Sequence, residues 1–311
     1  MASVTPVDAD RSQTVATLRP GEDLDAVFAC TRKERQISRA GTSYLTVELR
    51  DRTGSVRGRA FRGADLLAGR FERGDLVHVR GRVERFRDEL QVELRSIARA
   101  DGADADPTRF LPTAYRDLDE LEGFLEHLAR EVYDSGLKSL LHALLDDRRL
   151  RAEIRRAPCS LPAPPSQGRT HAGHHAYLGG LLEHTVAVAT MALELCTIHP
   201  RLDRDLLVCA AIVHDLGKTR EFVYGAEIRR SDEGRLLGHI ELGLRVIAAH
   251  LPPGLGPERR LALEHCVILH HGPQDGGQRF ASAEALALQR LNALDAQVKA
   301  AFEHGLTPRA A

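Results

Sequence analysis

The segment DRDLLVCAAIVHDLG, residues 203–217, decides the fold of the C-terminal half of this chain. Its apolar residues recur with helical spacing, so the sequence predicts a helix with one buried face that ends at Gly217. His214 and Asp215 stand side by side at this end, where an imidazole nitrogen and a carboxylate oxygen can bind the same cation. Such a pair alone is more often two solvated residues at a helix end, so the neighbouring histidines decide its meaning.

Two further polar side chains interrupt apolar helical faces on either side of this pair. One stripe holds Leu181, His184, Val188, Met191 and Leu195, and the other holds Leu288, Leu291, Asp295, Val298 and Phe302. A buried histidine needs a hydrogen-bond partner, and a buried carboxylate is costly unless it is paired or binds a metal. Each residue alone is more often an ordinary core or capping group. Because the two flank His214 and Asp215, we expect all four to share a site.

The other histidines favour the same interpretation. Eleven of the fifteen histidines fall between positions 171 and 271, and histidine is the commonest metal ligand. His239 opens a predicted helix after a glycine. His270 and His271 end another helix before Gly272 and Pro273, so both imidazoles can face one side. The order H, HD, H, HH, D across successive helices predicts a metal centre.

The N-terminal part is predicted to be a β-barrel. Apolar residues alternate in YLTVELRD (44–51), LVHVRGRVERF (76–86) and LQVELRSI (90–97), and turn-forming residues separate these strands. A short helical piece, ADLLAGRF (64–71), precedes the fourth of five strands. This order suits an OB-fold of about 75 residues. The predicted fold class is therefore a multidomain protein with an N-terminal small β-barrel and an all-α C-terminal part.

Composition sets the limits of this organisation. Of 311 residues, 43% are apolar and 28% are charged, and the net charge is −1, so nucleic-acid binding would need a local basic patch. No apolar run approaches the roughly 20 residues that span a bilayer, and five scattered cysteines indicate reduced thiols in a cytoplasm. We predict a disordered tail (1–19), an OB-fold (20–100), a linker (101–111), a helical connector (112–157) and a metal-binding domain (158–304). The expected helices are about 118–133, 136–156, 179–198, 203–216, 239–251, 258–271 and 282–304.

Residues 171–295 resemble the HD-domain phosphohydrolase superfamily. The strings HHAYLGGLLEHT (174–185), VHDLGK (213–218), EGRLLGHI (233–240), LHHG (269–272) and EALALQRLNALDAQV (284–298) are similar to those of the YhaM-type 3′→5′ exoribonucleases. That family joins an N-terminal OB domain to a C-terminal HD domain, and the resemblance covers about residues 20–300. The chain departs from the pattern in a glycine-rich loop after LHHG and at Phe61, where a larger aromatic side chain is expected.

The resemblance implies two sets of metal ligands. One ion would be held by His184, His214, Asp215 and Asp295. A second would be held by His239, His270 and His271, with Asp215 bridging the two. The expected cofactor is a divalent metal, two ions per chain, with Mn²⁺ first and Mg²⁺, Co²⁺ or Fe²⁺ as alternatives.

Such a centre suits hydrolysis of a phosphate ester. The ions would lower the pKa of a water molecule and neutralise charge on the phosphoryl oxygens. Asp215 would serve catalysis as the bridging ligand, and Lys218 would contact a nonbridging oxygen. His175 would contact phosphate or donate a proton to the leaving group. The alternatives are that Lys218 is an exposed lysine at a helix end and that His175 is a structural histidine.

The barrel would hold a polymeric substrate. Residues 20–100 carry 17 lysines and arginines against 13 acidic residues, a local excess of four positive charges. Basic side chains can follow a phosphate backbone and aromatic side chains can stack on bases. The predicted contacts are Tyr44, Arg57, Arg59, Phe61, Arg80, Arg82 and Phe86. For the arginines, the alternative is an ordinary solvated strand face.

Three functions compete on this evidence. The first is a cytoplasmic 3′→5′ exoribonuclease for single-stranded RNA, with single-stranded DNA as a further substrate, no membrane partner, and self-association implied by the resemblance. The second is an HD phosphohydrolase for small nucleotides, whose activity would not depend on residues 1–105. The third is a nucleic-acid-binding protein with a vestigial metal site, and the complete ligand set speaks against it.

Overall fold

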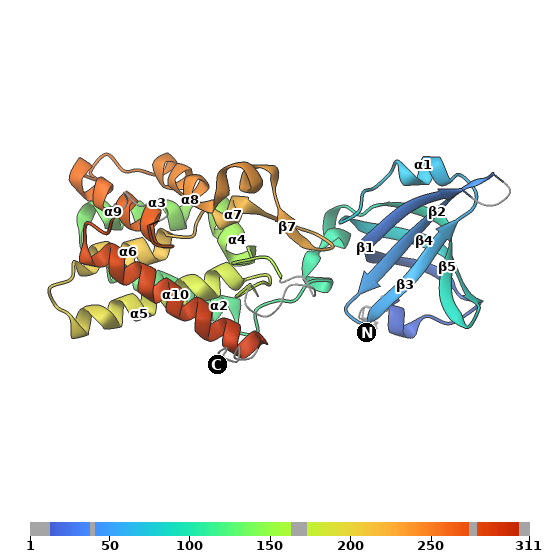
Figure 1. Cartoon of the computed structure of the whole chain (residues 1–311), viewed down its shortest axis with the longest axis horizontal. Coiled ribbons are helices and arrows are strands. Elements are labelled where there is room, and N and C mark those ends of the chain that lie inside the picture. The colour runs from blue at the N-terminus through green and yellow to red at the C-terminus, as the bar shows by residue number, and fades with distance from the viewer. Residues whose placement is uncertain (1–12, 38–40, 163–172, 274–278, 305–311) are drawn as a thin grey trace, which may run out of the picture. The chain divides into compact units, whose positions relative to one another are not determined.

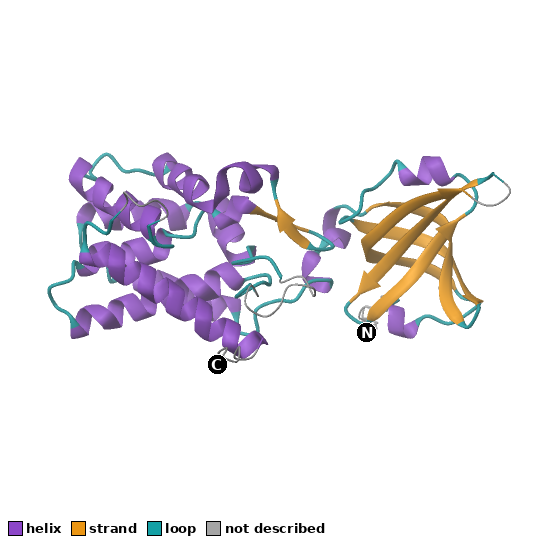
Figure 2. Ribbon diagram, viewed as in Figure 1, coloured by secondary structure: helices purple, strands orange, loops and turns teal. Residues whose placement is uncertain are grey.

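The computed structural model of the chain describes residues 13–37, 41–162, 173–273 and 279–304. The chain forms two compact units, residues 1–111 with 224–227, and residues 112–223 with 228–311 (Figure 1). Strands dominate the first unit and helices the second (Figure 2). The fold class predicted from the sequence is confirmed, whereas the domain boundaries at residues 100, 111 and 157 remain predictions.

The first unit is a closed barrel in the order β1-β2-β3-β5-β4. Its elements are β1 (Asp23–Ile37), β2 (Ser43–Asp51), β3 (Gly54–Ala60), α1 (Ala64–Ala68), β4 (Leu76–Phe86) and β5 (Glu89–Arg99), after a 3₁₀ turn at Val15–Thr17. β3 and β5 run parallel, and the other pairs are antiparallel. Val77, Val79 and Val83 are fully buried, as their alternation predicts. The barrel core therefore forms from the inward faces of the predicted strands.

The second unit is a helical bundle around one apolar core. Two 3₁₀ turns, Gly102–Ala105 and Pro107–Arg109, follow the barrel within the first unit. The elements after them are α2 (Leu118–Arg130), α3 (Ser135–Asp146), α4 (Arg148–Arg156), α5 (Gly180–Ile198), α6 (Arg204–Val213), α7 (Lys218–Glu221), β6 (Phe222–Tyr224, whose last residue is grouped with the first unit), β7 (Ile228–Arg230), α8 (Asp232–Ala249), α9 (Pro257–Leu269) and α10 (Ala283–His304). Nearly every residue of α6 is buried, and α5 and α10 pack against it. The segment that decides the fold in sequence is thus the centre of the bundle.

Local chemistry explains where the helices differ from the predicted ranges. The helix expected at 136–156 breaks at Asp147, whose side chain accepts hydrogen bonds from the amides of Arg149 and Leu150 and so starts α4. α8 as a whole begins at Asp232, where Ser231 caps it, but Gly238 has the non-helical angles φ 73° and ψ 165°, so the part of α8 after this kink starts at His239 as predicted. The short α7 and the β6–β7 hairpin were not predicted, since segments this short carry no periodicity.

The apolar helix α5 meets the length and hydropathy required to cross a membrane, but more than half of it is buried within the protein. Its buried residues include Glu183 and His184. Such burial is typical of the core helix of a globular bundle.

Candidate metal centre

The end of α6 brings His214 and Asp215 into the interior of the helical unit, where both are at most 1% exposed. His214 caps α6, and Asp215 lies in the turn before α7. The backbone packs very closely here, because a Cβ atom on Gly217 would lie 1.9 Å from the carbonyl oxygen of His239. The turn and α8 can approach only at a glycine. That contact places Asp215 beside His239 at the kink of α8.

One carboxylate oxygen of Asp215 faces the first pair of histidines. Its Oδ2 lies 3.3 Å from His214 Nε2 and 3.5 Å from His184 Nε2. The two ring nitrogens are themselves 3.2 Å apart. The Lys218 ammonium lies 2.8 Å from the same oxygen. This side of the site therefore gathers three predicted ligands and one cation.

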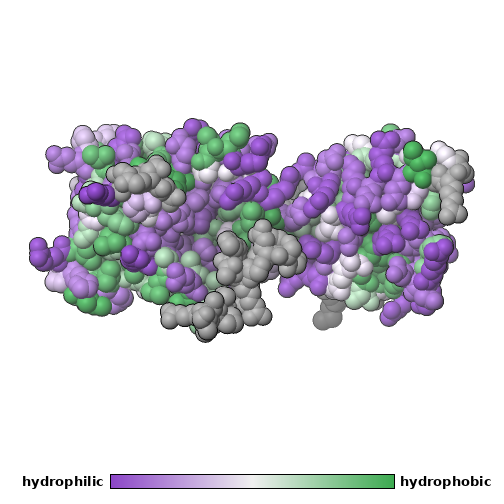
Figure 3. All heavy atoms as spheres, in the orientation of Figure 1, coloured by the Kyte–Doolittle hydropathy of each residue, from purple (hydrophilic) through white to green (hydrophobic). Residues whose placement is uncertain are grey.

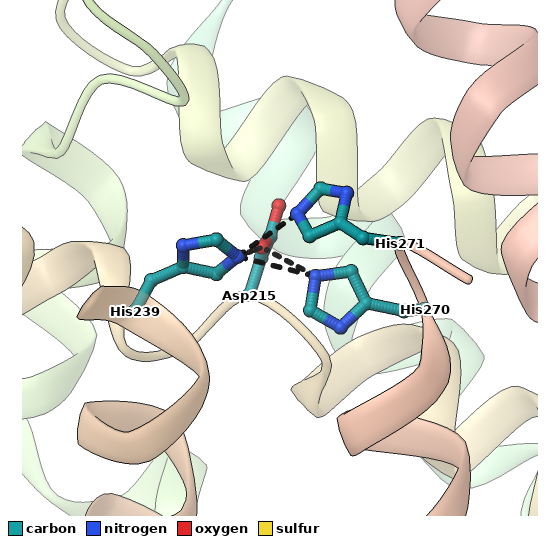
Figure 4. A group of neighbouring side chains, drawn as sticks. All are labelled: Asp215, His239, His270 and His271. Carbon is teal, nitrogen blue, oxygen red and sulfur yellow. Dashed lines mark hydrogen bonds and ion pairs between the residues drawn. The ribbon is translucent and has the colours of Figure 1, made fainter. Parts of the chain in front are cut away.

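The other oxygen of Asp215 faces a second group of histidines (Figure 4). Its Oδ1 lies 3.6 Å from His239 Nε2 and 3.5 Å from His270 Nε2. His239 Nε2 lies 3.3 Å from His270 Nε2 and 3.0 Å from His271 Nε2. Among the described residues no donor makes a hydrogen bond to Oδ1, although the atom is buried. A buried carboxylate oxygen without a donor is costly, and a bound cation would relieve this cost.

The opposite ring nitrogens of these histidines are held in place by oxygen atoms. The contacts of Nδ1 are His184 with Asp295 Oδ2 at 2.6 Å, His214 with the Ala211 carbonyl at 2.8 Å, His239 with Glu221 Oε2 at 3.4 Å and His270 with the Val267 carbonyl at 2.5 Å. A metal-binding histidine usually engages its second nitrogen in this way, which fixes the tautomer and the ring direction. Four rings are thus oriented so that Nε2 points toward Asp215.

The spacing of the inward atoms fits divalent ions. Two ligand atoms at about 2.1 Å from one ion lie about 3.0 Å apart in an octahedron and about 3.4 Å apart in a tetrahedron. The contacts around Asp215 range from 3.2 to 3.5 Å in the first group and from 3.0 to 3.6 Å in the second. Histidine and aspartate therefore form a divalent-metal site here. Among the candidate metal-binding groups of the described residues, two contain Asp215: one with His184 and His214, and one with His239, His270 and His271.

The protonation states suit metal binding as well. Burial alone would raise the pKa of Asp215, but Lys218 and His214 hold it well below its ordinary value. Burial lowers the pKa of His184 and of His270 to about 4. Near neutral pH the carboxyl group is thus ionised and these imidazoles are neutral, the forms that bind a metal.

Asp295 lies on the outer side of the site, beside two histidines. Its carboxylate contacts Nδ1 of His184, not the Nε2 side that faces Asp215, and it also lies 3.0 Å from His175 Nε2. Asp295 thus orients His184, and its carboxylate also forms a candidate metal-binding group with His175 and His184, so its role as a ligand of the first ion remains a prediction. The apolar stripe that predicted its burial is also interrupted, because Val298 and Phe302 are 45% and 84% exposed.

His175 belongs to a buried polar network on the outer side of His184. Its Nδ1 lies 2.9 Å from the Tyr177 hydroxyl, which donates a hydrogen bond of 2.6 Å to Glu183. Its Nε2 contacts Asp295. The described polar contacts of His175 are thus with residues that support the site, and its proposed contact with phosphate remains a prediction.

Three neighbouring residues were not predicted to belong to the site. Glu221 orients His239, Cys159 lies beside Lys218 and Asp215, and His174 lies beside Cys159. The paired histidines in HHAYLGG were a usable signal for His174, but nothing in the sequence marks Cys159 or Glu221. Lys218 is only 5% exposed, so the alternative of a solvated lysine at a helix end is wrong.

On the barrel, five of the predicted nucleic-acid contacts form ring contacts or line one groove. The rings of Tyr44 and Phe61 stack with centroids 5.6 Å apart, and the Arg59 guanidinium lies 5.6 Å from the Phe86 ring centroid. Arg57 and Arg59 line a groove of about 720 Å³ on the barrel, together with acidic side chains such as Glu48. On the face seen in Figure 3, hydrophilic residues cover much of this unit, with smaller hydrophobic areas among them.

Arg80 and Arg82 do not join this group. They lie on β4, and β5 separates β4 from the β3 residues Arg57 and Arg59. Arg80 pairs with Asp25 at 3.0 Å. Arg82 stands in register with Asp23 on one side and Glu93 on the other. Because acidic residues lie next to both arginines, this face of β4 carries charges of both signs.

Comparisons with known proteins agree with both units. Residues 181–301 match the HD domain family, and residues 30–99 match the OB-fold nucleic acid binding domain. The chain is 28% identical over 288 residues to the 3′-5′ exoribonuclease YhaM of Shouchella clausii, covering 90% of this chain and 85% of the relative. It is 26% identical over 282 residues to the YhaM protein of Bacillus subtilis, covering 89% and 86%.

Among solved structures, the second OB-fold domain of replication protein A from Methanococcus maripaludis is 20% identical. The likeness covers 30% of this chain and 97% of that domain, with a TM-score of 0.24. A score this low supports nothing further.

Proposed function

We infer that this chain, which belongs to the YhaM-type family of OB-fold and HD-domain proteins, is a metal-dependent 3′→5′ exoribonuclease that hydrolyses phosphodiester bonds in single-stranded RNA. The observation that carries this inference is Asp215, whose two oxygens each face a separate group of imidazole nitrogens. Bound divalent ions supply a nucleophile from water at neutral pH and neutralise charge on the phosphoryl oxygens.

The residues of the chain have distinct parts in this proposal. His184, His214 and Asp215 would hold one ion, and His239, His270 and His271 would hold a second, with Asp215 shared. Asp295 and Glu221 fix the direction of two of the rings. The Lys218 ammonium stands against Asp215 Oδ2 and would add positive charge beside a phosphoryl oxygen.

We propose Mn²⁺ as the ion, with Co²⁺, Fe²⁺ and Mg²⁺ as alternatives. The inward donor set is mostly imidazole nitrogen with one shared carboxylate. Mg²⁺ prefers oxygen ligands and an octahedral shell rich in water, whereas the later divalent ions accept imidazole readily. The donor chemistry therefore favours the three transition ions over Mg²⁺, and among them imidazole affinity rises from Mn²⁺ through Fe²⁺ to Co²⁺.

The barrel is proposed to hold the single strand, and single-stranded DNA is a second proposed substrate. Stacked aromatic rings beside arginines are the features by which OB-folds bind single strands without sequence preference. A cytoplasmic location is supported by the five cysteines, all of which are free thiols. Self-association is also proposed, and the exposed apolar side chains Leu286, Leu294 and Val298 along α10 supply a surface for it.

End-labelled RNA tests the proposed activity. With Mn²⁺, RNA labelled at the 5′ end should give a ladder that shortens with time, and the same RNA labelled at the 3′ end should release its label as a mononucleotide at once. A preparation of Asp215→Ala purified in parallel identifies contaminating nucleases. Early release of the 5′ label would contradict the polarity. Turnover confined to small nucleotides would move the enzyme to the second class of function.

A further inference from the structure

Cys159 and His174 stand beside the metal centre but have no part in the proposed ligand sets. Cys159 Sγ lies 3.8 Å from Asp215 Oδ2 and 3.8 Å from His174 Nε2. Lys218 donates a hydrogen bond of 3.3 Å to the same sulfur. The His174 ring also stands 5.4 Å from the His184 ring, centroid to centroid.

The surroundings of Cys159 differ from those of the other cysteines. All five are buried, and Cys30, Cys196, Cys209 and Cys266 belong to the hydrophobic clusters of the two units. Cys159 belongs to no such cluster among the described residues, and its sulfur instead contacts an ammonium, a carboxylate and an imidazole. Packing of a small apolar group does not explain this environment.

We propose that Cys159, His174 and His184 form a thiophilic position at the metal centre, which takes a soft divalent ion such as Cd²⁺ or Zn²⁺. Their ligand atoms all lie within 4.8 Å of one another. A sulfur and a nitrogen or oxygen on one tetrahedral ion lie about 3.6 Å apart, close to the 3.8 Å that separates Sγ from His174 Nε2 and from Asp215 Oδ2. The Lys218 ammonium contacts the same sulfur and Asp215 Oδ2, so an ion bound here would take over the contacts that Lys218 now makes.

The centre would therefore have two parts with different metal preferences, the position with the thiol and the proposed catalytic ligand sets. Thiolate sulfur selects soft ions, whereas Mn²⁺ and Mg²⁺ gain little from it. The position shares His184 with the proposed catalytic centre, so it rests on that proposal. A soft ion bound here would withdraw His184 from the productive set and would inhibit hydrolysis. The thiol releases its proton to solvent when the sulfur binds.

Absorption spectroscopy of the full chain tests this position. Cd²⁺ or Co²⁺ added to metal-free protein should give a thiolate-to-metal charge-transfer band in the near ultraviolet. Cys159→Ser should remove the band and weaken Cd²⁺ binding about tenfold or more, while Mn²⁺ affinity changes little. Cys196→Ser is the matched control and should keep the band. In His174→Asn the band should still form, but at a higher Cd²⁺ concentration than in the wild-type protein.

Two results would overturn the proposal. One is a wild-type protein that binds Cd²⁺ without the band, and the other is a band that persists in Cys159→Ser. Circular dichroism of each variant shows that loss of the band is not loss of the fold. Failure of the chain to bind any divalent ion would instead overturn the proposed function, so the two failures can be told apart.

Discussion

The metal centre and the barrel surface place their functional residues in opposite ways. In the centre, five histidine side chains from four regions of the chain converge on the Asp215 carboxylate, and four of the rings are fixed by an oxygen atom at Nδ1. On the barrel, arginines and aromatic rings are spread over several strands and lie among acidic side chains. A reaction centre needs atoms at fixed positions, whereas a binding platform needs only an overall charge and some stacking surface.

This difference determines how a substitution should act. A substitution in the centre removes a metal ligand or frees a ligand ring to rotate. Its effect on hydrolysis should therefore be large, and it should depend on which residue is changed. A change on the barrel removes one of several weak contacts, so its effect should be small and should depend on salt. The five predictions below test this contrast, beginning with the largest effect.

Removing the shared carboxylate should have the largest effect. Asp215→Ala takes a ligand from both groups, so RNA hydrolysis should fall by about 10³-fold or more, equivalent to about 4 kcal/mol or more in activation free energy. Because alanine leaves the buried Lys218 ammonium without its carboxylate partner, circular dichroism should check the fold, and Asp215→Asn, which keeps the size of the side chain, serves as a second variant. Asp147→Asn is the matched control, because Asp147 also contacts a histidine, His250, but lies outside the site. Retention of more than about 5% activity with excess metal would remove Asp215 from the mechanism.

The second prediction concerns the number of ions. His239→Ala combined with His271→Ala should lower bound metal from about two ions per chain to about one, because the first group keeps its own ligands. Elemental analysis of protein freed of loosely bound metal measures this directly. A wild-type protein with a single ion would favour a mononuclear centre, in which these histidines only contact the substrate.

The outcome for the site shows what a sequence can and cannot establish here. The helical period placed His184 in a buried stripe. His214 and Asp215 are neighbours in the sequence, so their closeness in space could be predicted without knowing the tertiary structure. The same period put Asp295 near them, but which ring nitrogen of His184 it contacts depends on how α10 packs against α5. Glu221 lies in a four-residue helix without any pattern, and Cys159 lies in a loop. Both are brought to the site only by the packing of distant segments.

The third prediction addresses the orientation of a ligand. Glu221→Gln keeps the size of the side chain but removes the negative charge that faces His239 Nδ1 at 3.4 Å. Metal affinity of the second group should fall about 10- to 100-fold. Saturating Mn²⁺ should restore most of the activity, which loss of a true ligand would not allow. Titration of activity against free metal gives the answer, and an unchanged midpoint would mean that Glu221 does not orient His239.

The barrel should respond more weakly, and in a way that salt reveals. Arg57→Ala combined with Arg59→Ala removes two side chains that line the groove beside Tyr44 and Phe61. On a single strand each phosphate contact contributes about 0.7 to the slope of log affinity against log salt, so the slope should fall by about 1.4. Binding to a labelled oligonucleotide at several salt concentrations measures it, with hydrolysis of a small phosphodiester as the control. An unchanged slope would mean that the groove does not hold the strand.

The smallest effect is expected for Arg80 and Arg82, although the sequence ranked them equally with Arg57 and Arg59. Asp25 holds Arg80 at 3.0 Å and lies 2.5 Å from His78 Nε2. The hydrogen bond from His78, and then the charge of Arg80, lower the pKa of Asp25, so its carboxylate stays ionised and continues to neutralise the arginine. A phosphate would have to break this pair, and Arg82 faces acidic residues on both neighbouring strands. Arg80→Ala combined with Arg82→Ala should therefore change the salt slope by less than about 0.7, under one phosphate contact. A fall as large as that of the groove variant would show that the strand also crosses β4, and the contact surface would then extend around the barrel.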